Sequence, residues 1–257
     1  MHADRLARRI VKPFVFTLCL LPLAWLAAGL LGWPAASLGA NPIEKIQDTL
    51  GIWGLRLLLV TLAITPLREM TGWAPVVAFR RLLGLFAFSY IAMHFLFYLL
   101  VDQGIDWRLL LEDIAKRPFI TAGFAAFLLL VPLAATSTKR AMRRMGRRWQ
   151  RLHRLVYPAA ILGCTHFYWQ VKADVREPLV YILVLAVLLG WRVHRHRRSR
   201  AADRPSAMPP SIRRPPAPVC QSSPSSSSHQ PSEDASTGSP SSTMATNSGP
   251  SWRNAQL

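Results

Sequence analysis

Three histidines lie inside long apolar stretches of this sequence: His94, His153 and His166. An ionisable side chain at membrane depth is costly, so each of them indicates a functional site unless it fills a hydrogen-bonded place in the core. Imidazole is also the usual protein ligand of non-covalently bound haem iron. Because three histidines occur on only two predicted helices, we favour cofactor binding over simple packing.

The apolar stretches themselves have the length of membrane-spanning helices. A helix needs about 20 apolar residues to cross a hydrocarbon layer of roughly 30 Å. Six stretches of about this length predict an all-α membrane protein with a six-transmembrane-helix bundle: 13–31, 50–66, 82–100, 118–136, 152–169 and 178–193. The first follows a basic start, as a signal peptide would, but it is too long for one and we expect a retained helix.

The distribution of Lys and Arg predicts that the N and C termini are both cytoplasmic. Segments on the side of the termini hold 19 of these residues, against 6 on the other side, which is the bias of a positive-inside topology. The net charge of +18 therefore mostly reflects topology, and the basic run 137–151 indicates an anchor at anionic lipid and not a nucleic-acid surface. Residues 1–200 are expected to form one membrane domain, and the Ser/Pro-rich residues 201–257 a disordered cytoplasmic tail.

The depth of each histidine predicts which two can share a ligand. At about 1.5 Å per helical residue from the basic inner edge, His94 lies roughly 20 Å deep, His166 roughly 27 Å and His153 roughly 8 Å. His94 and His166 are the closer pair, so we predict one haem iron between them in the outer half of the membrane. His153 then marks a second, inner site, and Pro158 is expected to bend the fifth helix.

Three arginines lie where the anionic groups of a cofactor would need a cation. Arg56 is near the outer end of the second span, where it could pair with a haem propionate or extend to the lipid interface. Arg151 and Arg154 flank His153. They could hold a flavin phosphate, a second propionate or a quinone head group, or they could serve only as a positive-inside anchor.

Motifs of several redox and catalytic classes are absent from the sequence. It has no C-x-x-C-H for covalent haem, and Cys19, Cys164 and Cys220 are not clustered as in an iron–sulfur or zinc site. It has no dinucleotide fingerprint and no Walker loop. An electron-transfer protein of this kind must receive electrons from a membrane quinol or a separate cytoplasmic flavoprotein. A free-standing ferric or quinone reductase, and a non-redox polytopic transporter or scaffold, are the alternatives.

Five short elements occur together between residues 8 and 195: TPLR, RRLLG, RPFITAG, ATS and RWQRLHRLVY. In combination they resemble the family of haem-binding membrane subunits of the bacterial periplasmic protein-methionine-sulfoxide reductase system, called MsrQ or YedZ. The resemblance implies a multi-pass inner-membrane protein with haem b and FMN, for which quinol is the donor. It also implies a heterodimer with a periplasmic molybdopterin reductase that repairs oxidised methionine, so that this chain is an electron-transfer subunit and is not catalytic alone.

This family is similar in turn to the transmembrane part of ferric reductases and NADPH oxidases. Those proteins hold two stacked haems with two histidines on each of two helices. The resemblance assigns His153 and His166 to one helix and His94 to the other, where the second position is occupied by Arg80 or Arg81. The resemblance therefore gives an outer haem one histidine from each helix, His94 and His166. An inner haem would have only His153.

Overall fold

The computed structural model describes residues 11–33, 36–171 and 174–202, and this part of the chain is helical with no β-strand. Five helical segments in it are long and apolar enough to cross a membrane. These are α2 (Lys12–Leu30), α3 (Pro42–Thr71), α4 (Val77–Phe97) continued by the π-helical turn η4 (Tyr98–Asp102), α6 (Pro118–Ala135) and α10 (Arg176–Ala202). The expected all-α membrane class is thus confirmed.

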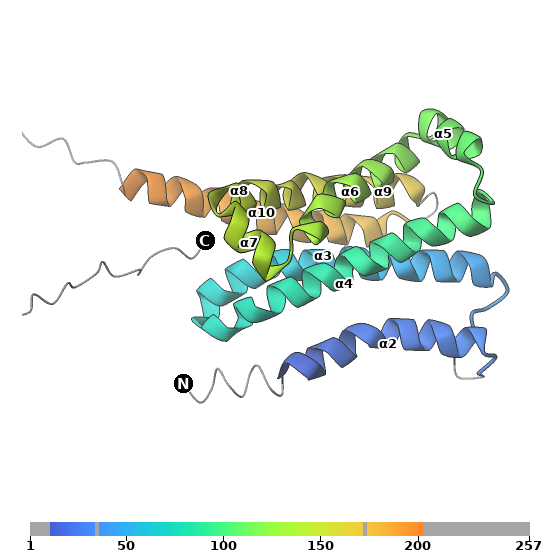
Figure 1. Cartoon of the computed structure of the whole chain (residues 1–257), viewed down its shortest axis with the longest axis horizontal. Coiled ribbons are helices and arrows are strands. Elements are labelled where there is room, and N and C mark those ends of the chain that lie inside the picture. The colour runs from blue at the N-terminus through green and yellow to red at the C-terminus, as the bar shows by residue number, and fades with distance from the viewer. Residues whose placement is uncertain (1–10, 34–35, 172–173, 203–257) are drawn as a thin grey trace, which may run out of the picture. The chain divides into compact units, whose positions relative to one another are not determined.

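The remaining elements are short. They are η3 (Ala74–Val76), α5 (Trp107–Lys116), α7 (Lys139–Met145), α8 (Arg147–Leu152), η5 (His153–Leu155) and α9 (Val156–Gln170). In Figure 1, α7 and α8 lie at the same end of the bundle as the last turns of α10, and α5 lies at the opposite end. The predicted tail 201–257 lies outside the described residues, except for its first two residues, which end α10.

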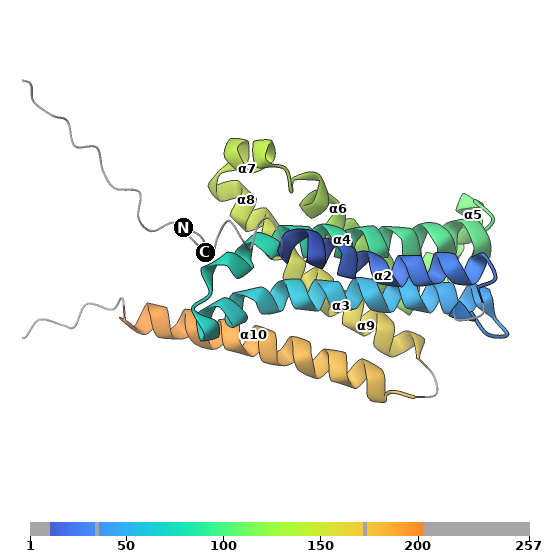
Figure 2. The ribbon, with the colours of Figure 1, turned by 90° about the horizontal axis from the view of Figure 1, so that it is seen from below.

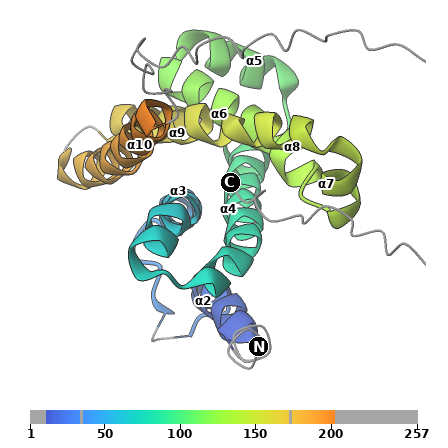
Figure 3. The same cartoon turned by 90° about the vertical axis from the view of Figure 1, so that its left-hand side faces the viewer.

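Two helix pairs form the centre of the membrane domain: α3 packs on α4, and α6 packs on α9. The pairs join where α4 meets α6 and where α9 meets α3. Fully buried alanines, Ala87 on α4 and Ala159 and Ala160 on α9, let the helices approach closely. Figure 3 looks along the bundle and shows α2 at its edge, beyond the α3–α4 pair.

Two outer helices are attached to this centre. Figure 2 shows α10 running alongside α3, and it packs on both α3 and α9. The hydroxyl of the buried Tyr90 on α4 donates a 2.7 Å hydrogen bond to the carbonyl oxygen of Cys19, which ties α2 to α4. The outward side chains of α10 are apolar, with Val180, Leu183 and Val187 all exposed. Such a surface is costly in water but suits hydrocarbon.

The expected end of the second span at Pro66 is wrong. Helix α3 continues through Pro66 to Thr71, and Gly72 ends it in the left-handed conformation at φ 67°, donating its N–H to the carbonyl oxygen of Arg68. A proline interrupts one backbone hydrogen bond of a helix without necessarily stopping it. The stop comes from the glycine, which adopts positive φ without the strain that a Cβ would cause.

The fifth predicted span, 152–169, is not one bent helix. The 3₁₀ turn η5 separates α8 from α9, and Pro158 lies in the first turn of α9. A first-turn proline costs no helical hydrogen bond, because the N–H groups there have no partner within the helix. The regular α-helix is therefore interrupted before Pro158 and not at it. Helix α9 is 15 residues long, which explains why it is not among the five long apolar segments.

Candidate functional site

The structure brings His94 of α4 and His166 of α9 together. Their ring centroids are 6.2 Å apart, with an angle of 76° between the ring planes. The two residues come from different helix pairs, so their meeting place lies where the α3–α4 pair joins the α6–α9 pair. His153 of η5 is not part of this pair of rings.

His94 is held by the neighbouring helix α3. Its Nδ1 atom donates a hydrogen bond to the carbonyl oxygen of Gln47, 3.0 Å away. The ring packs against Gly51, one helical turn further on, where an added Cβ would lie 3.1 Å from both Nδ1 and Cε1 of the imidazole. Glycine therefore makes room for the ring at this crossing.

His166 is held by α6 in the same way. Its Nδ1 atom donates to the carbonyl oxygen of Phe119 at 2.7 Å, and the ring packs against Gly123, again four residues further on. A Cβ at position 123 would lie only 2.8 Å from Nδ1, closer than real contacts allow. Each histidine is 47 residues after its carbonyl partner. The same arrangement thus occurs twice, once in each helix pair.

These hydrogen bonds determine which ring nitrogen is available. A carbonyl oxygen can only accept, so Nδ1 must carry the proton in both histidines. The Nε2 atom of each neutral ring then keeps its lone pair, and among the described residues it has no hydrogen-bond partner. An Nδ1–H held by a carbonyl, with Nε2 left for the metal, is the usual state of a metal-binding histidine.

The donor set fits a haem better than a metal ion bound by protein alone. Protein-only sites take three or four side-chain ligands, and no group of three His, Cys, Asp or Glu residues occurs in the described ranges. A porphyrin supplies four nitrogens of its own, so two imidazoles complete the iron. The centroids of the two imidazoles are 6.2 Å apart, so both rings could hold the same group.

Two further features beside the rings agree with a cofactor site. The side-chain Oε1 of Gln47 is buried without a hydrogen-bond partner in the described structure. A buried amide left unpaired costs about 1–3 kcal/mol, and the carboxylate of a cofactor could pair with it after an amide flip. The Phe119 ring of α6 lies beside His166, with centroids 6.3 Å apart, so the pair of imidazoles has an aromatic neighbour.

His153 lies in a different environment. Its ring stacks on Trp149 with centroids 3.9 Å apart, and its Nδ1 donates to the carbonyl oxygen of the same residue at 3.2 Å. Arg80 of α4, which is partly buried, is close enough to act on His153 electrostatically, whereas Arg81 is exposed. Of the two arginines that could occupy the position of a fourth histidine, Arg80 is therefore the one with an electrostatic influence on His153.

The arginines predicted at the two cofactor sites have other contacts or are exposed. The Nε of Arg56 donates to the hydroxyl of Tyr181 on α10 at 2.7 Å, and its guanidinium lies over the Trp53 ring at 5.2 Å. Arg151 and Arg154 are both exposed at the end of the bundle that carries α8. Arg56 is thus a link between α3 and α10 in this structure, and Arg151 and Arg154 are surface cations.

Four residues of the site were not expected from the sequence: Gln47, Gly51, Phe119 and Gly123. A glycine inside an apolar helix is a signal of close backbone approach. Both glycines lie within predicted spans, so the sequence indicated a close approach at each of them. Which histidine each glycine contacts depends on how the helices pack, and the sequence does not give that.

Comparison with known proteins agrees with these features. Residues 50–164 match the family described as ferric reductase like transmembrane component. The chain is 49% identical over 207 residues to the protein-methionine-sulfoxide reductase heme-binding subunit MsrQ of Xanthomonas axonopodis pv. citri (strain 306), covering 77% of this chain and 93% of that protein. No solved structure matches the chain.

Two further relatives carry the same name. The MsrQ subunit of Bordetella pertussis (strain Tohama I) is 50% identical over 199 residues, covering 76% of this chain and 94% of the relative. That of Xanthomonas campestris pv. campestris (strain 8004) is 50% identical over 194 residues, covering 72% and 89%. At this identity and coverage the assignment follows, and the chain belongs to the MsrQ family of multi-pass bacterial membrane proteins.

Proposed function

We propose that this chain is a haem-binding electron-transfer subunit of a methionine-sulfoxide reductase system. Haem b would be held by the Nε2 atoms of His94 and His166. The observation that carries the proposal is the pair of imidazoles, whose ring centroids are 6.2 Å apart. The Nδ1 atom of each donates a hydrogen bond to a backbone carbonyl of a neighbouring helix. The heme-binding name of the relatives supports it.

Bound haem would supply one-electron redox chemistry. The chain's own residues would bind and orient it. The carbonyls of Gln47 and Phe119 keep the protons on Nδ1 and the rings in place, and Gly51 and Gly123 leave the space in which the rings lie. Fixing ligands in this way raises their basicity and limits their rotation.

The proposed path starts at the quinone pool, or at a cytoplasmic flavin reductase, and ends at a periplasmic molybdopterin reductase that repairs oxidised proteins. The two proteins would form a heterodimer in the bacterial inner membrane. We propose six spans, in which η5 and α9 form the fifth, with both termini cytoplasmic. The basic residues of α7, α8 and the end of α10 gather at one end of the bundle (Figure 1), which supports this orientation.

A second cofactor site is proposed at the inner end. His153 would be its ligand, and Arg151 and Arg154 are candidates to hold the phosphate of FMN or a propionate. The exposure of both arginines and the electrostatic influence of Arg80 on His153 support an anion there. For Arg56 we propose a propionate contact at the outer site, in addition to its bond with Tyr181.

The visible spectrum of the purified full-length protein tests the proposal. A Soret band that shifts on reduction with dithionite is expected, together with at least one haem per polypeptide. A colourless but folded protein would instead support a transporter or scaffold. Extraction and quantification of flavin from the same sample tests FMN.

The role as a subunit needs a separate measurement. Electron transfer from a reduced quinol analogue should occur only when the periplasmic reductase and its methionine-sulfoxide substrate are present. Steady turnover with a ferric chelate or a quinone, without that partner, would support a free-standing reductase.

A further inference from the structure

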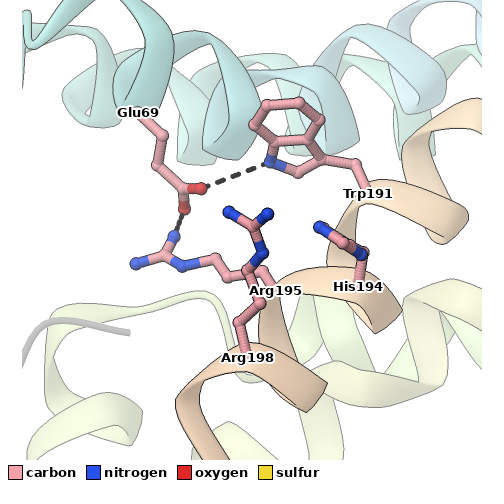
Figure 4. Close-up of a pocket in the computed structure, with 5 residues that line it drawn as sticks. All are labelled: Glu69, Trp191, His194, Arg195 and Arg198. Carbon is pink, nitrogen blue, oxygen red and sulfur yellow. Dashed lines mark hydrogen bonds and ion pairs between the residues drawn. The ribbon is translucent and has the colours of Figure 1, made fainter. Parts of the chain in front are cut away.

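A pocket of about 530 Å³ lies between the ends of α3 and α10, away from the histidine pair. Figure 4 shows the side chains that line it. One comes from α3 and four come from the last turns of α10: Glu69, Trp191, His194, Arg195 and Arg198. None of them belongs to the proposed haem site, so the following inference goes beyond the proposed function.

Glu69 organises this pocket. Its carboxylate accepts a 3.3 Å hydrogen bond from the indole nitrogen of Trp191 and forms an ion pair with Arg195 (Figure 4). One carboxylate balances one of the two guanidinium groups, so the pocket keeps a positive charge even with a neutral His194. It is therefore suited to an anion, and Arg198 is the cation that Glu69 does not pair with in Figure 4.

Helix geometry places the four side chains of α10 on one face. Positions 191, 194, 195 and 198 follow the i, i+3, i+4, i+7 spacing of a single helical stripe. His196 and Arg197 lie on the same turns but point to other sides, and they do not line the pocket. The basic residues of this helix end are thus divided between a pocket face and a plain exposed face.

The chemistry of the lining favours phosphate. A guanidinium presents paired N–H donors that match two oxygens of one phosphate, and an imidazole adds a further donor. Trp191 follows the apolar part of α10 and is partly exposed, as expected for an indole at the boundary between hydrocarbon and water. Basic pockets between membrane helices at this level bind lipid head groups.

We propose that this pocket binds a phosphate group, carried either by an anionic lipid head group or by a soluble phosphate compound. Binding would join α10 to the end of α3 through the anion, alongside the Glu69 ion pair. The haem content and the haem spectrum do not depend on it. A protein without haem could therefore still bind phosphate, and the two proposals can fail separately.

Native mass spectrometry of the full-length protein with phosphatidylglycerol or phosphatidylcholine tests the lipid source. The double variant His194→Gln/Arg198→Gln should retain phosphatidylglycerol about tenfold less well, as expected for the loss of a charge-assisted hydrogen bond. The matched variant His196→Gln/Arg197→Gln removes the same groups from the exposed face and should bind as the wild type does. Phosphatidylcholine should bind weakly to all three proteins.

Titration with inorganic phosphate, followed by thermal unfolding, tests the soluble source. Stabilisation of the wild type that is lost in the pocket variant alone would assign the site to a free phosphate, and retention of phosphatidylglycerol with the same dependence would assign it to a lipid. Equal losses in both double variants, or no binding of either probe, would overturn the proposal. A further measurement leaves the charges of the pocket in place. Phosphatidylglycerol should change the indole fluorescence of the wild type, and Trp191→Phe should abolish that change.

Discussion

The Nδ1 atom of His94 lies 3.0 Å from the carbonyl oxygen of Gln47, and this contact explains how a flexible side chain is held at one orientation between helices. His166 and Phe119 repeat it on the other helix pair. Backbone carbonyls of a helix already accept one hydrogen bond, but their second lone pair remains available. The two imidazoles are therefore fixed by the backbone of α3 and α6 without any carboxylate.

Removal of either paired imidazole should abolish the outer haem. His94→Ala and His166→Ala are expected to lose the low-spin spectrum, because a single imidazole would not hold the haem as the pair would. His153→Ala should lower the haem or flavin content and leave part of the signal. Haem per polypeptide in the purified variants is the measurement, with His196→Ala as the control for loss of an exposed histidine. Complete loss in His153→Ala with retention in His166→Ala would reverse the pairing.

Substitution of Gly51 or Gly123 should test whether the position of the imidazole rings matters, because both histidines are kept. Gly123→Ala would place a Cβ 2.8 Å from Nδ1 of His166, so the ring must move and its bond to Phe119 is lost. The loss of one hydrogen bond is worth about 1 kcal/mol, which is roughly a fivefold to tenfold weaker retention of haem. Gly51→Ala, with contacts at 3.1 Å, should have a smaller effect.

Gly190 of α10 is the matched control, because a Cβ there meets no atom within 4 Å. Gly190→Ala should bind haem as the wild type does. A shift of the midpoint potential and of the low-spin electron paramagnetic resonance signal is expected only for positions 51 and 123. If all three variants behave alike, the effect is one of general stability and the glycines do not position the rings.

The fold was largely predictable from the sequence, for a physical reason. Long apolar runs indicate membrane helices whatever their neighbours are, and Pro118 marks the start of α6 because a first-turn proline is tolerated. Pro66 gave a false end, since a proline weakens a helix while Gly72 actually terminates it. Helix α5 was not expected, and its outward side chains Trp107 and Leu111 show that apolar residues also occur in a connecting segment.

The site was predictable in its residue types but not in its supports. Helical rise alone placed His94 nearer in depth to His166 than to His153, and the structure does bring the rings of His94 and His166 together. Rise does not determine which faces of two helices meet, so the carbonyls of Gln47 and Phe119 could not be assigned. The hydrogen bond between Arg56 and Tyr181 could not be predicted from the sequence either, because Tyr181 lies 125 residues away on α10.

Arg56 can be tested against its structural role. Arg56→Gln removes the cation and the bond to Tyr181, whereas Tyr181→Phe removes only the bond. If Arg56 contacts a propionate, Arg56→Gln should weaken haem retention about tenfold or more, as a charge-assisted bond is worth about 1.5–3 kcal/mol, while Tyr181→Phe should leave it nearly unchanged. Haem transfer to an apoprotein acceptor measures the retention. Equal effects of the two variants would restrict Arg56 to joining α3 and α10.

The inner site can be tested through the two neighbouring arginines of α4. Arg80 is partly buried and acts on His153, while Arg81 is exposed. Arg80→Gln removes the positive charge next to His153 and should change the part of the haem or flavin signal that His153→Ala also changes. Arg81→Gln removes the same charge from the surface and should leave that signal intact. A double variant of Arg80 and His153 should then show no further loss than His153→Ala alone, because both residues would serve one site. Additive losses would mean that Arg80 acts elsewhere, for example on Tyr157 and Arg192, the other groups to which it is electrostatically coupled.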